Sequence, residues 1–217
     1  MKVYIIKLLV FTVGVSFFNV IFCQEKRLEY SFEFSPTFSN VSNNLTESSF
    51  TGTGTAISVA RVELRTDKII DPTLALALLS TGSTTKSELG GSLGIEKITF
   101  IDTYLYLNLL AGAKMDFDKY FIHIESGLGL NLSNKTRRKT EFTNGDKENV
   151  KTDAMLNSGE FNDMTIPLIL SVARKFKVKK NEIYLGLRAY YGINQIVVDV
   201  PRNNHYYGFG YTIGIIY

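Results

Sequence analysis

The chain has 217 residues, of which 21% are charged and 45% hydrophobic, and its formal net charge is +3. This length supports one β domain of ordinary size or two small ones. The near balance of charge provides no basic field for nucleic acid, so we expect no nucleic-acid partner. Aromatic content is high, with 12 tyrosines and 15 phenylalanines, and tryptophan is absent.

The first 23 residues have the layout of a secretory signal peptide. Two lysines precede an apolar core that ends at Phe22, and a polar segment begins at Gln24. The core has about 15 residues, fewer than the ~20 that a helix needs to cross a bilayer, which disfavours an N-terminal anchor. We therefore expect residues 1–23 to be a cleaved signal peptide and residues 24–217 to form one domain.

Cys23 is the only cysteine, and cleavage after it leaves the exported domain with none. The bulky Phe22 before it does not fit a lipoprotein signal, which requires a small residue there. Without disulfides, an exported domain draws its stability from a core, a membrane or a partner. With two histidines and no cysteine, the domain is expected to hold no metal and no cofactor.

Alternation of apolar and polar residues with a period of two dominates the rest of the chain, which indicates β-strands. In the last segment, for example, Phe209, Tyr211 and Ile213 alternate with Gly210, Thr212 and Gly214. Eight segments show the pattern: residues 27–34, 50–64, 72–79, 103–112, 120–132, 164–172, 183–194 and 206–217.

The connections between these segments alternate between long and short. Long polar connections follow the first, third and fifth segments, and short ones follow the second, fourth and sixth. Barrels of the outer membrane show this pattern, with short periplasmic turns and longer external loops, and their strand number is even. The sequence therefore predicts an all-β fold, an eight-stranded antiparallel up-and-down transmembrane β-barrel.

The two faces of the strands differ in bulk. One face carries long apolar side chains with aromatics near the strand ends, and the other carries glycines and a few charges. The lumen of an eight-stranded barrel is narrow and cannot hold bulky side chains from every strand, so we expect the apolar face to contact lipid. The alternative is a soluble lipocalin-like barrel that binds a ligand with its apolar face inside.

Charged residues on the predicted inner face require partners, because unpaired charge in a narrow lumen is unfavourable. We predict a network centred on Arg188 that plugs the lumen, which Arg61 and Glu63 are candidates to join. The alternative is a narrow porin-like channel lined by the same charges. The predicted network consists of Glu29, Glu33, His123, Glu125 and Arg188.

The segment around His123 also suggests a lipid hydrolase, which needs a nucleophile and a base on one face. His123 and Glu125 share a face, but Ser126 points to the opposite one. We therefore expect no catalytic residues and a non-enzymatic protein that acts as a scaffold or interaction partner for other envelope proteins.

The longest connection, which follows Leu132, is expected to be a charged external loop. Lys135, Arg137, Arg138 and Lys139 lie near its start. Basic residues in an external loop are candidates to contact lipopolysaccharide phosphates. The alternative is a loop that is simply solvated.

Three parts of the chain resemble a known family of proteins. They are "TIPLILSVARKF" (Thr165 to Phe176), "IYLGLRAYYGIN" (Ile183 to Asn194) and the terminal aromatic strand. They are similar to the porin-like outer-membrane β-barrel family common in Bacteroidota, which includes the PorT proteins of the type IX secretion and gliding system. The resemblance implies an outer-membrane location and no particular activity. The terminal Tyr217 resembles the signal read by the barrel-assembly machinery.

Overall fold

The computed structural model describes residues 28–41, 48–49, 55–66, 69–89, 94–154, 164–178, 181–194 and 205–217. These residues form eleven β-strands, and none of them belongs to a helix long and apolar enough to cross a membrane. The predicted signal peptide, residues 1–23, lies outside the described residues. The final connection, residues 195–204, does as well.

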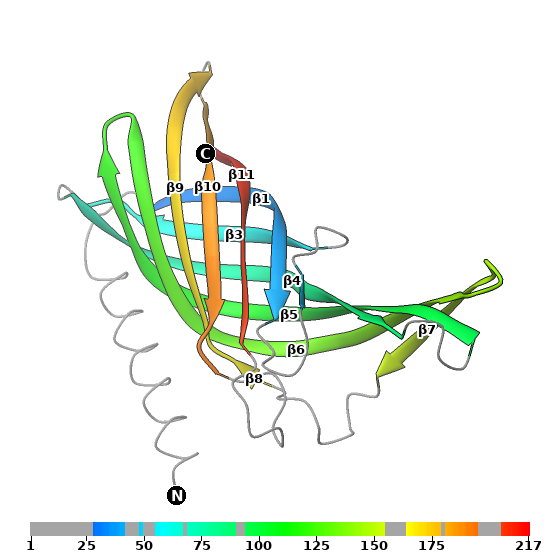
Figure 1. Ribbon diagram of the computed structural model, residues 1–217. Helices are drawn as coiled ribbons and strands as arrows, with labels where there is room; N and C mark the ends of the chain where they lie inside the picture. Colours follow the sequence, from blue (N-terminus) through cyan, green and yellow to red (C-terminus); the bar gives the residue numbers. More distant parts are fainter. Residues whose placement is uncertain are drawn as a thin grey trace, which may run out of the picture.

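Eight of the strands close into a ring by pairing with their neighbours in chain order (Figure 1). Every pairing is antiparallel, and β11 pairs with β1 to complete the ring, with Phe32 opposite Ile215. The predicted eight-stranded up-and-down barrel is therefore confirmed. Its strands are β1 (Leu28–Val41), β3 (Ala56–Leu64), β4 (Ile70–Glu88), β5 (Ile95–Phe117), β6 (Tyr120–Phe142), β9 (Pro167–Val178), β10 (Asn181–Gly192) and β11 (Tyr206–Ile216).

The two rims of the barrel differ. β1 begins and β11 ends at the same rim, where the tight turn at Asp118 and Lys119 joins β5 to β6. We call this the terminal rim, and the other the far rim. At the terminal rim the backbone N–H of Tyr217 donates to the carbonyl oxygen of Tyr30 at 2.9 Å, so pairing between the first and last strands continues to the final residue.

The bulky apolar face of the strands lies outside the ring. Phe32, Leu76 and Leu187 are each more than half exposed, and similar side chains lie on the outer wall of every barrel strand except β3, whose outer face carries smaller residues. On the inner face Glu33, Arg61 and tyrosines such as Tyr184 are buried. A soluble barrel with an apolar interior has the reverse arrangement, so the lipocalin-like alternative does not fit this structure.

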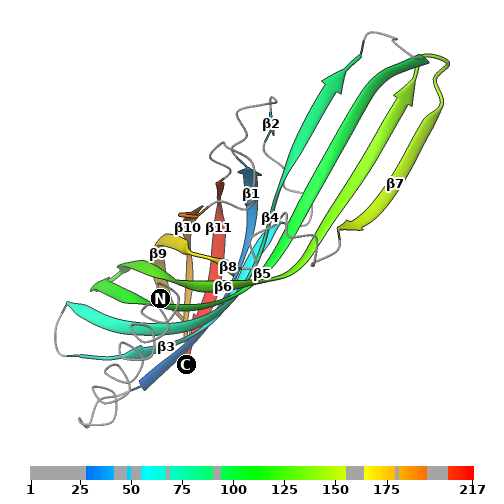
Figure 2. The ribbon, with the colours of Figure 1, turned by 90° about the horizontal axis from the view of Figure 1, so that it is seen from below.

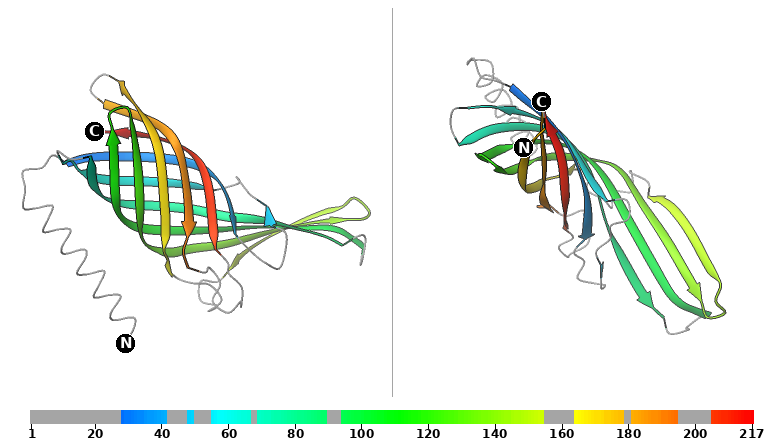
Figure 3. Two further views of the ribbon diagram at one scale, coloured as in Figure 1. Left: turned by 60° about the vertical axis from the view of Figure 1, so that its left-hand side comes forward. Right: turned by 90° about the horizontal axis from the view of Figure 1, so that it is seen from above.

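Three neighbouring strands continue beyond the far rim. β5 and β6 each have 23 residues and β4 has 19, whereas a tilted membrane crossing needs about 9–11. Their extensions pair with one another and with β7 (Lys147–Ala154), and form a sheet that projects from the ring (Figures 2 and 3). The short β2 (Ser48–Ser49) pairs with β4 at Thr84 and Thr85.

This projecting sheet comprises residues 82–88, 95–104, 133–142 and β7. The sequence predicted a loop here, which is wrong for most of the segment after Leu132, because β6 runs on to Phe142 and turns back into β7. The prediction failed because charged and polar residues occupy both faces of the extension, so the alternation that reveals the other strands is missing. Two neighbouring strands supply the backbone partners instead.

Candidate functional site

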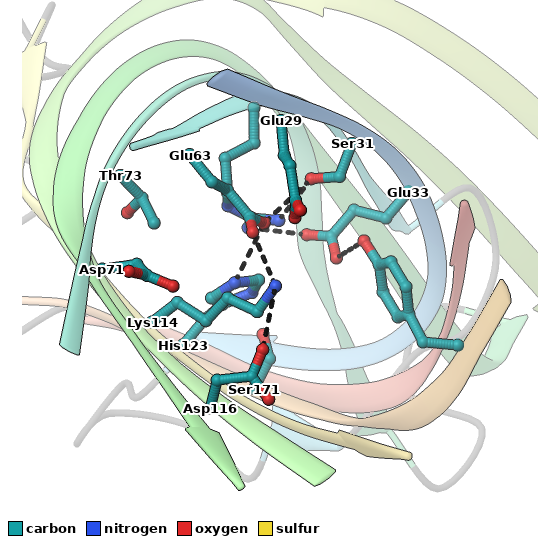
Figure 4. Close-up of polar contacts among 12 residues, drawn as sticks. Glu29, Ser31, Glu33, Glu63, Asp71, Thr73, Lys114, Asp116, His123 and Ser171 are labelled. Atoms are coloured by element: carbon teal, nitrogen blue, oxygen red, sulfur yellow. Dashed lines mark hydrogen bonds and ion pairs between the residues drawn. The ribbon is translucent and has the colours of Figure 1, made fainter. Parts of the chain in front are cut away.

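A network of buried ion pairs fills the half of the lumen nearer the terminal rim (Figure 4). Arg61 on β3 is its most connected member. Its Nε and Nη2 atoms donate to the two carboxylate oxygens of Glu125 on β6, both at 2.6 Å, and Nη2 also donates to Glu33 at 2.9 Å. Because β3 and β6 are not neighbours in the ring, Arg61 spans the lumen.

Glu33 joins a second arginine to the network. Its Oε1 atom accepts from both Arg61 and Arg188, while its Oε2 atom accepts from the Tyr184 hydroxyl at 2.7 Å. Arg188 also donates to Ser171 at 2.9 Å and to Ser35 at 3.1 Å. The carboxylate therefore holds β1, β3 and β10 together through buried side chains.

Glu63 on β3 has separate partners, which lie nearer the terminal rim. Its Oε2 atom lies 2.6 Å from Nζ of Lys114, and its Oε1 atom lies 3.3 Å from Nε2 of His123. Lys114 also lies over the ring of Phe121, 4.9 Å from its centroid. Three buried carboxylates, Glu33, Glu63 and Glu125, thus face the three cations Arg61, Lys114 and Arg188. These opposite charges balance within the lumen.

Arg65 and its carboxylate partners form a further cluster at the terminal rim. Arg65 lies 2.8 Å from Glu29, 3.3 Å from Asp71 and 2.7 Å from Asp116, and Lys175 lies 2.6 Å from Asp116. Partial burial works against the charge of Arg65, but hydrogen bonds to Glu29 and Asp116 outweigh it and raise the pKa of the guanidinium. This cluster joins residues of β1, β4, β5 and β9 at the terminal rim.

Aromatic and aliphatic side chains fill the other half of the lumen. Tyr106 and Tyr206 stack with ring centroids 5.4 Å apart, and the Tyr206 hydroxyl lies 2.6 Å from that of Thr165. Tyr190 donates to the hydroxyl of Thr81 at 3.1 Å. The buried cluster around these rings consists of Ile57, Val59, Ala75, Ala77, Leu79, Tyr104, Tyr106, Leu110, Ile169, Tyr190 and Tyr206.

The residues singled out by sequence fall into three groups. Glu33, Glu125 and Arg188 belong to the lumen network, which is arranged around Arg61 rather than around Arg188. His123 contacts Glu63 in the same lumen. Glu29 lies at the rim and contacts Arg65, so it is separate from the Arg61 contacts.

Lys114 and Tyr184 are members of the network that the sequence reading missed. The period-two pattern does contain a signal for Lys114, because it has the same parity as Tyr106 and Leu110 and therefore shares their inner face. Among the described residues, no group of three or more histidine, cysteine or acidic side chains is placed to hold a metal ion.

The four basic residues after Leu132 do not share one face. A register shift lies between the pairs Leu105–Ser133 and Tyr106–Asn131, which leaves Leu132 as an extra residue in β6. Beyond this bulge the parity of the strand is reversed. Lys135, Arg137 and Lys139 therefore continue the outer face of the barrel, whereas Arg138 lies on the opposite face, 3.4 Å from Glu148.

Tyr217, the proposed assembly signal, is exposed at the terminal rim. Its ring packs edge-on against Phe32 on β1, with centroids 6.3 Å apart. This position places the last side chain on the outer wall, at the seam where the barrel closes.

A family model described as "Outer membrane protein beta-barrel domain" matches residues 16–198. The matched region begins inside the predicted signal peptide and includes most of the barrel. No curated protein matches the chain.

Three solved structures of outer-membrane barrels are similar to the chain, all at low sequence identity. Ail of Yersinia pestis is 9% identical with a TM-score of 0.45, and the match covers 88% of this chain and 99% of Ail. Neisserial surface protein A is 12% identical with a TM-score of 0.41, covering 89% and 98%. The N-terminal barrel domain of Pseudomonas aeruginosa OprF is 5% identical with a TM-score of 0.33, covering 89% and 100%.

Proposed function

The chain belongs to the outer membrane protein beta-barrel domain family, and on that premise we propose that it is a non-conducting, non-enzymatic scaffold. In this proposal the barrel anchors the projecting sheet outside the cell. Outer-membrane barrels keep both termini and their short turns on the periplasmic side. The terminal rim is therefore periplasmic, and the projecting sheet is extracellular.

The observation that carries the proposal is the filled lumen. The Arg61 side chain crosses from β3 to Glu125 on β6, and the Tyr106 and Tyr206 rings close the other half. All four side chains are almost completely buried. A solute would have to break buried ion pairs and then displace packed rings. Opening the ion layer alone would cost several kcal/mol.

The same contacts support a non-enzymatic role. His123 and Glu125 contact other lumen residues. The Ser126 hydroxyl donates to the carbonyl oxygen of Pro167 at 2.9 Å and lies on the opposite face of β6. A hydrolase needs its nucleophile and base within hydrogen-bond reach of each other, and these residues do not provide that arrangement.

Within the family, we propose a relation to the PorT-like barrels of Bacteroidota, on the likeness of residues 165–176 and 183–194 to that group. The proposed partners are outer-membrane lipid, the barrel-assembly machinery that would read Tyr217, and other envelope proteins. An export signal in residues 1–23 is part of the same proposal.

Conductance in planar bilayers tests the scaffold against the narrow channel. Purified, folded protein should give no regular current steps, while a porin of known conductance added to the same bilayer should give them. A variant with Tyr106, Tyr190 and Tyr206 changed to alanine should also be silent, because the ion-pair layer still fills its half of the lumen. Regular steps from the unchanged protein would reject the plugged scaffold and favour the channel.

A further inference from the structure

The outer face of the projecting sheet carries an uneven distribution of charge. Directly opposite residues on neighbouring strands share a face, so the register defines rows that run across the sheet. The row at the tip reads Glu88, Lys97, Glu141 and Lys147. Its charges alternate, and the pairs Lys97–Glu88 at 4.0 Å and Lys147–Glu141 at 3.3 Å neutralise it.

The next two rows toward the ring contain cations and no carboxylate. One row reads Lys86, Thr99, Lys139 and Asn149, and the other reads Thr84, Ile101, Arg137 and Lys151. We call the four cations of these rows the basic face, together with Lys135 in the row nearest the ring, where Asp153 is its directly opposite partner. Its members are Lys86, Lys135, Arg137, Lys139 and Lys151.

Few interactions inside the protein compensate this charge. Among the described side chains, no carboxylate lies within ion-pair distance of Lys86, Lys139 or Lys151, all of which are exposed. Arg137 donates through Nε to the Asn149 side chain at 2.8 Å, a contact that orients the guanidinium without neutralising it. The basic face is therefore available to bind an anion from outside the protein.

The position of the basic face on the barrel indicates which anion it binds. Because of the bulge at Leu132, the face continues the lipid-facing wall of the barrel. Leu132 is 43% exposed and belongs to the upper edge of the apolar belt. At ~3.4 Å per residue, Lys135 lies roughly 10 Å and Lys139 roughly 24 Å farther along the strand, and strand tilt reduces their height above the belt.

We propose that the basic face binds the phosphate groups of lipopolysaccharide in the surrounding outer leaflet. This lipid carries phosphates on its sugar headgroup and inner core, in the layer directly above the acyl chains. Lysine and arginine form strong charge-assisted hydrogen bonds with phosphate oxygens. The inference rests on the proposed extracellular position of the sheet, but it does not depend on whether the lumen conducts.

Two double variants of equal charge provide the test. R137Q/K139Q removes two cations from the basic face. R138Q/K147Q removes one arginine and one lysine from the same hairpin, but Arg138 lies on the other face and Lys147 is paired with Glu141. The protein is folded in detergent, checked by its altered gel migration on boiling, and titrated with purified, fluorescently labelled lipopolysaccharide.

We expect R137Q/K139Q to weaken binding roughly 30-fold, since each basic side chain near an anionic surface contributes about a factor of five, and R138Q/K147Q to change it less than about twofold. Dephosphorylated lipopolysaccharide should bind the unchanged protein at least as weakly as intact lipopolysaccharide binds R137Q/K139Q, which keeps three of the five cations. Equal losses in the two variants, or equal binding of the dephosphorylated lipid, would refute the proposal.

Dextran sulfate serves as a soluble polyanion in the same titration. If R137Q/K139Q loses dextran sulfate binding while lipopolysaccharide binding is unchanged, the face binds soluble polyanions and the lipid assignment is wrong. Conductance recorded on the same samples separates this result from the scaffold proposal. If the barrel does not conduct and does not bind lipopolysaccharide, only the proposal for the basic face is rejected. If it conducts and binds lipopolysaccharide, only the plugged scaffold is rejected.

Discussion

The phenol ring of Tyr184 on β10 packs against the bare backbone of Gly214, its directly opposite partner on β11. The three atoms nearest to the position of a Cβ on Gly214 are two carbons of this ring and its hydroxyl oxygen. The Tyr184 hydroxyl then reaches Glu33 at 2.7 Å. Gly208 is likewise directly opposite Tyr190, whose Oη and Cζ atoms lie nearest to the position of a Cβ there. The glycines of the last strand thus make room for tyrosines that fill the lumen.

Replacing Gly214 by alanine should therefore destabilise the barrel by roughly 1–3 kcal/mol, the usual range for overpacking a filled core. The added methyl group would displace the Tyr184 ring and disturb its hydrogen bond to Glu33. Urea titration followed by gel migration without boiling measures the folded fraction. This readout replaces tryptophan fluorescence, because the chain has no tryptophan.

A double-mutant cycle separates this clash from a general intolerance of β11 to substitution. In a Tyr184→Ala background the obstructing ring is absent, so adding Gly214→Ala should change the free energy of unfolding by less than 0.5 kcal/mol or so. An equally large loss in both backgrounds would show that the ring is not the cause.

Arg61 should be the most sensitive charged residue in the lumen. Arg61→Met leaves the buried Glu125 carboxylate with the Thr73 hydroxyl at 3.3 Å as its only hydrogen-bond donor among the described side chains. Leaving a buried charge unpaired costs about 3–5 kcal/mol, and this loss should appear in the same urea titration. Arg61→Met/Glu125→Gln should recover part of it, because the uncompensated charge is removed.

Arg65→Met at the terminal rim is the matched control for Arg61→Met. Arg65 also contacts carboxylates, but its side chain and that of Glu29 are 28% and 27% exposed. Of its other partners, Asp116 keeps Lys175 at 2.6 Å, and the buried Asp71 keeps the backbone N–H of Thr66 at 2.6 Å. The loss in Arg65→Met should be clearly smaller, on the order of 1 kcal/mol. Equal losses for the two arginines would contradict the idea that burial makes the Arg61 contacts special.

The sequence predicts the barrel well because the two faces of each barrel strand lie in different environments, one on the outer wall and the other in the lumen. In β10, for example, the contrast between exposed Leu187 and buried Arg188 appears as a period of two. It predicts the projecting sheet poorly, because polar and charged residues occupy both faces of β6 beyond Leu132. Which charges meet across the lumen depends on strand tilt and register. Parity places Arg61 and Glu125 on the inner face but does not pair them.

Tyr217 provides a test of assembly that is independent of stability. If the terminal aromatic is read by the assembly machinery, Tyr217→Phe should leave the amount of protein in the outer membrane unchanged, while Tyr217→Ser should reduce it several-fold. Both variants keep the backbone pairing between Tyr217 and Tyr30. They should therefore refold equally well from urea into detergent. Poor refolding of Tyr217→Ser would instead assign the effect to its lost contact with Phe32.

The orientation of the barrel can be tested by cysteine labelling, because the only native cysteine, Cys23, lies in the predicted signal peptide. Asn144 is exposed in the turn between β6 and β7 at the tip of the projecting sheet, and Lys119 is exposed in the turn at the terminal rim. In intact cells, a membrane-impermeant maleimide should label the Asn144→Cys variant and not the Lys119→Cys variant. Permeabilising the outer membrane should make the second site reactive. The opposite result would place the projecting sheet in the periplasm and remove the basis for its contact with lipopolysaccharide.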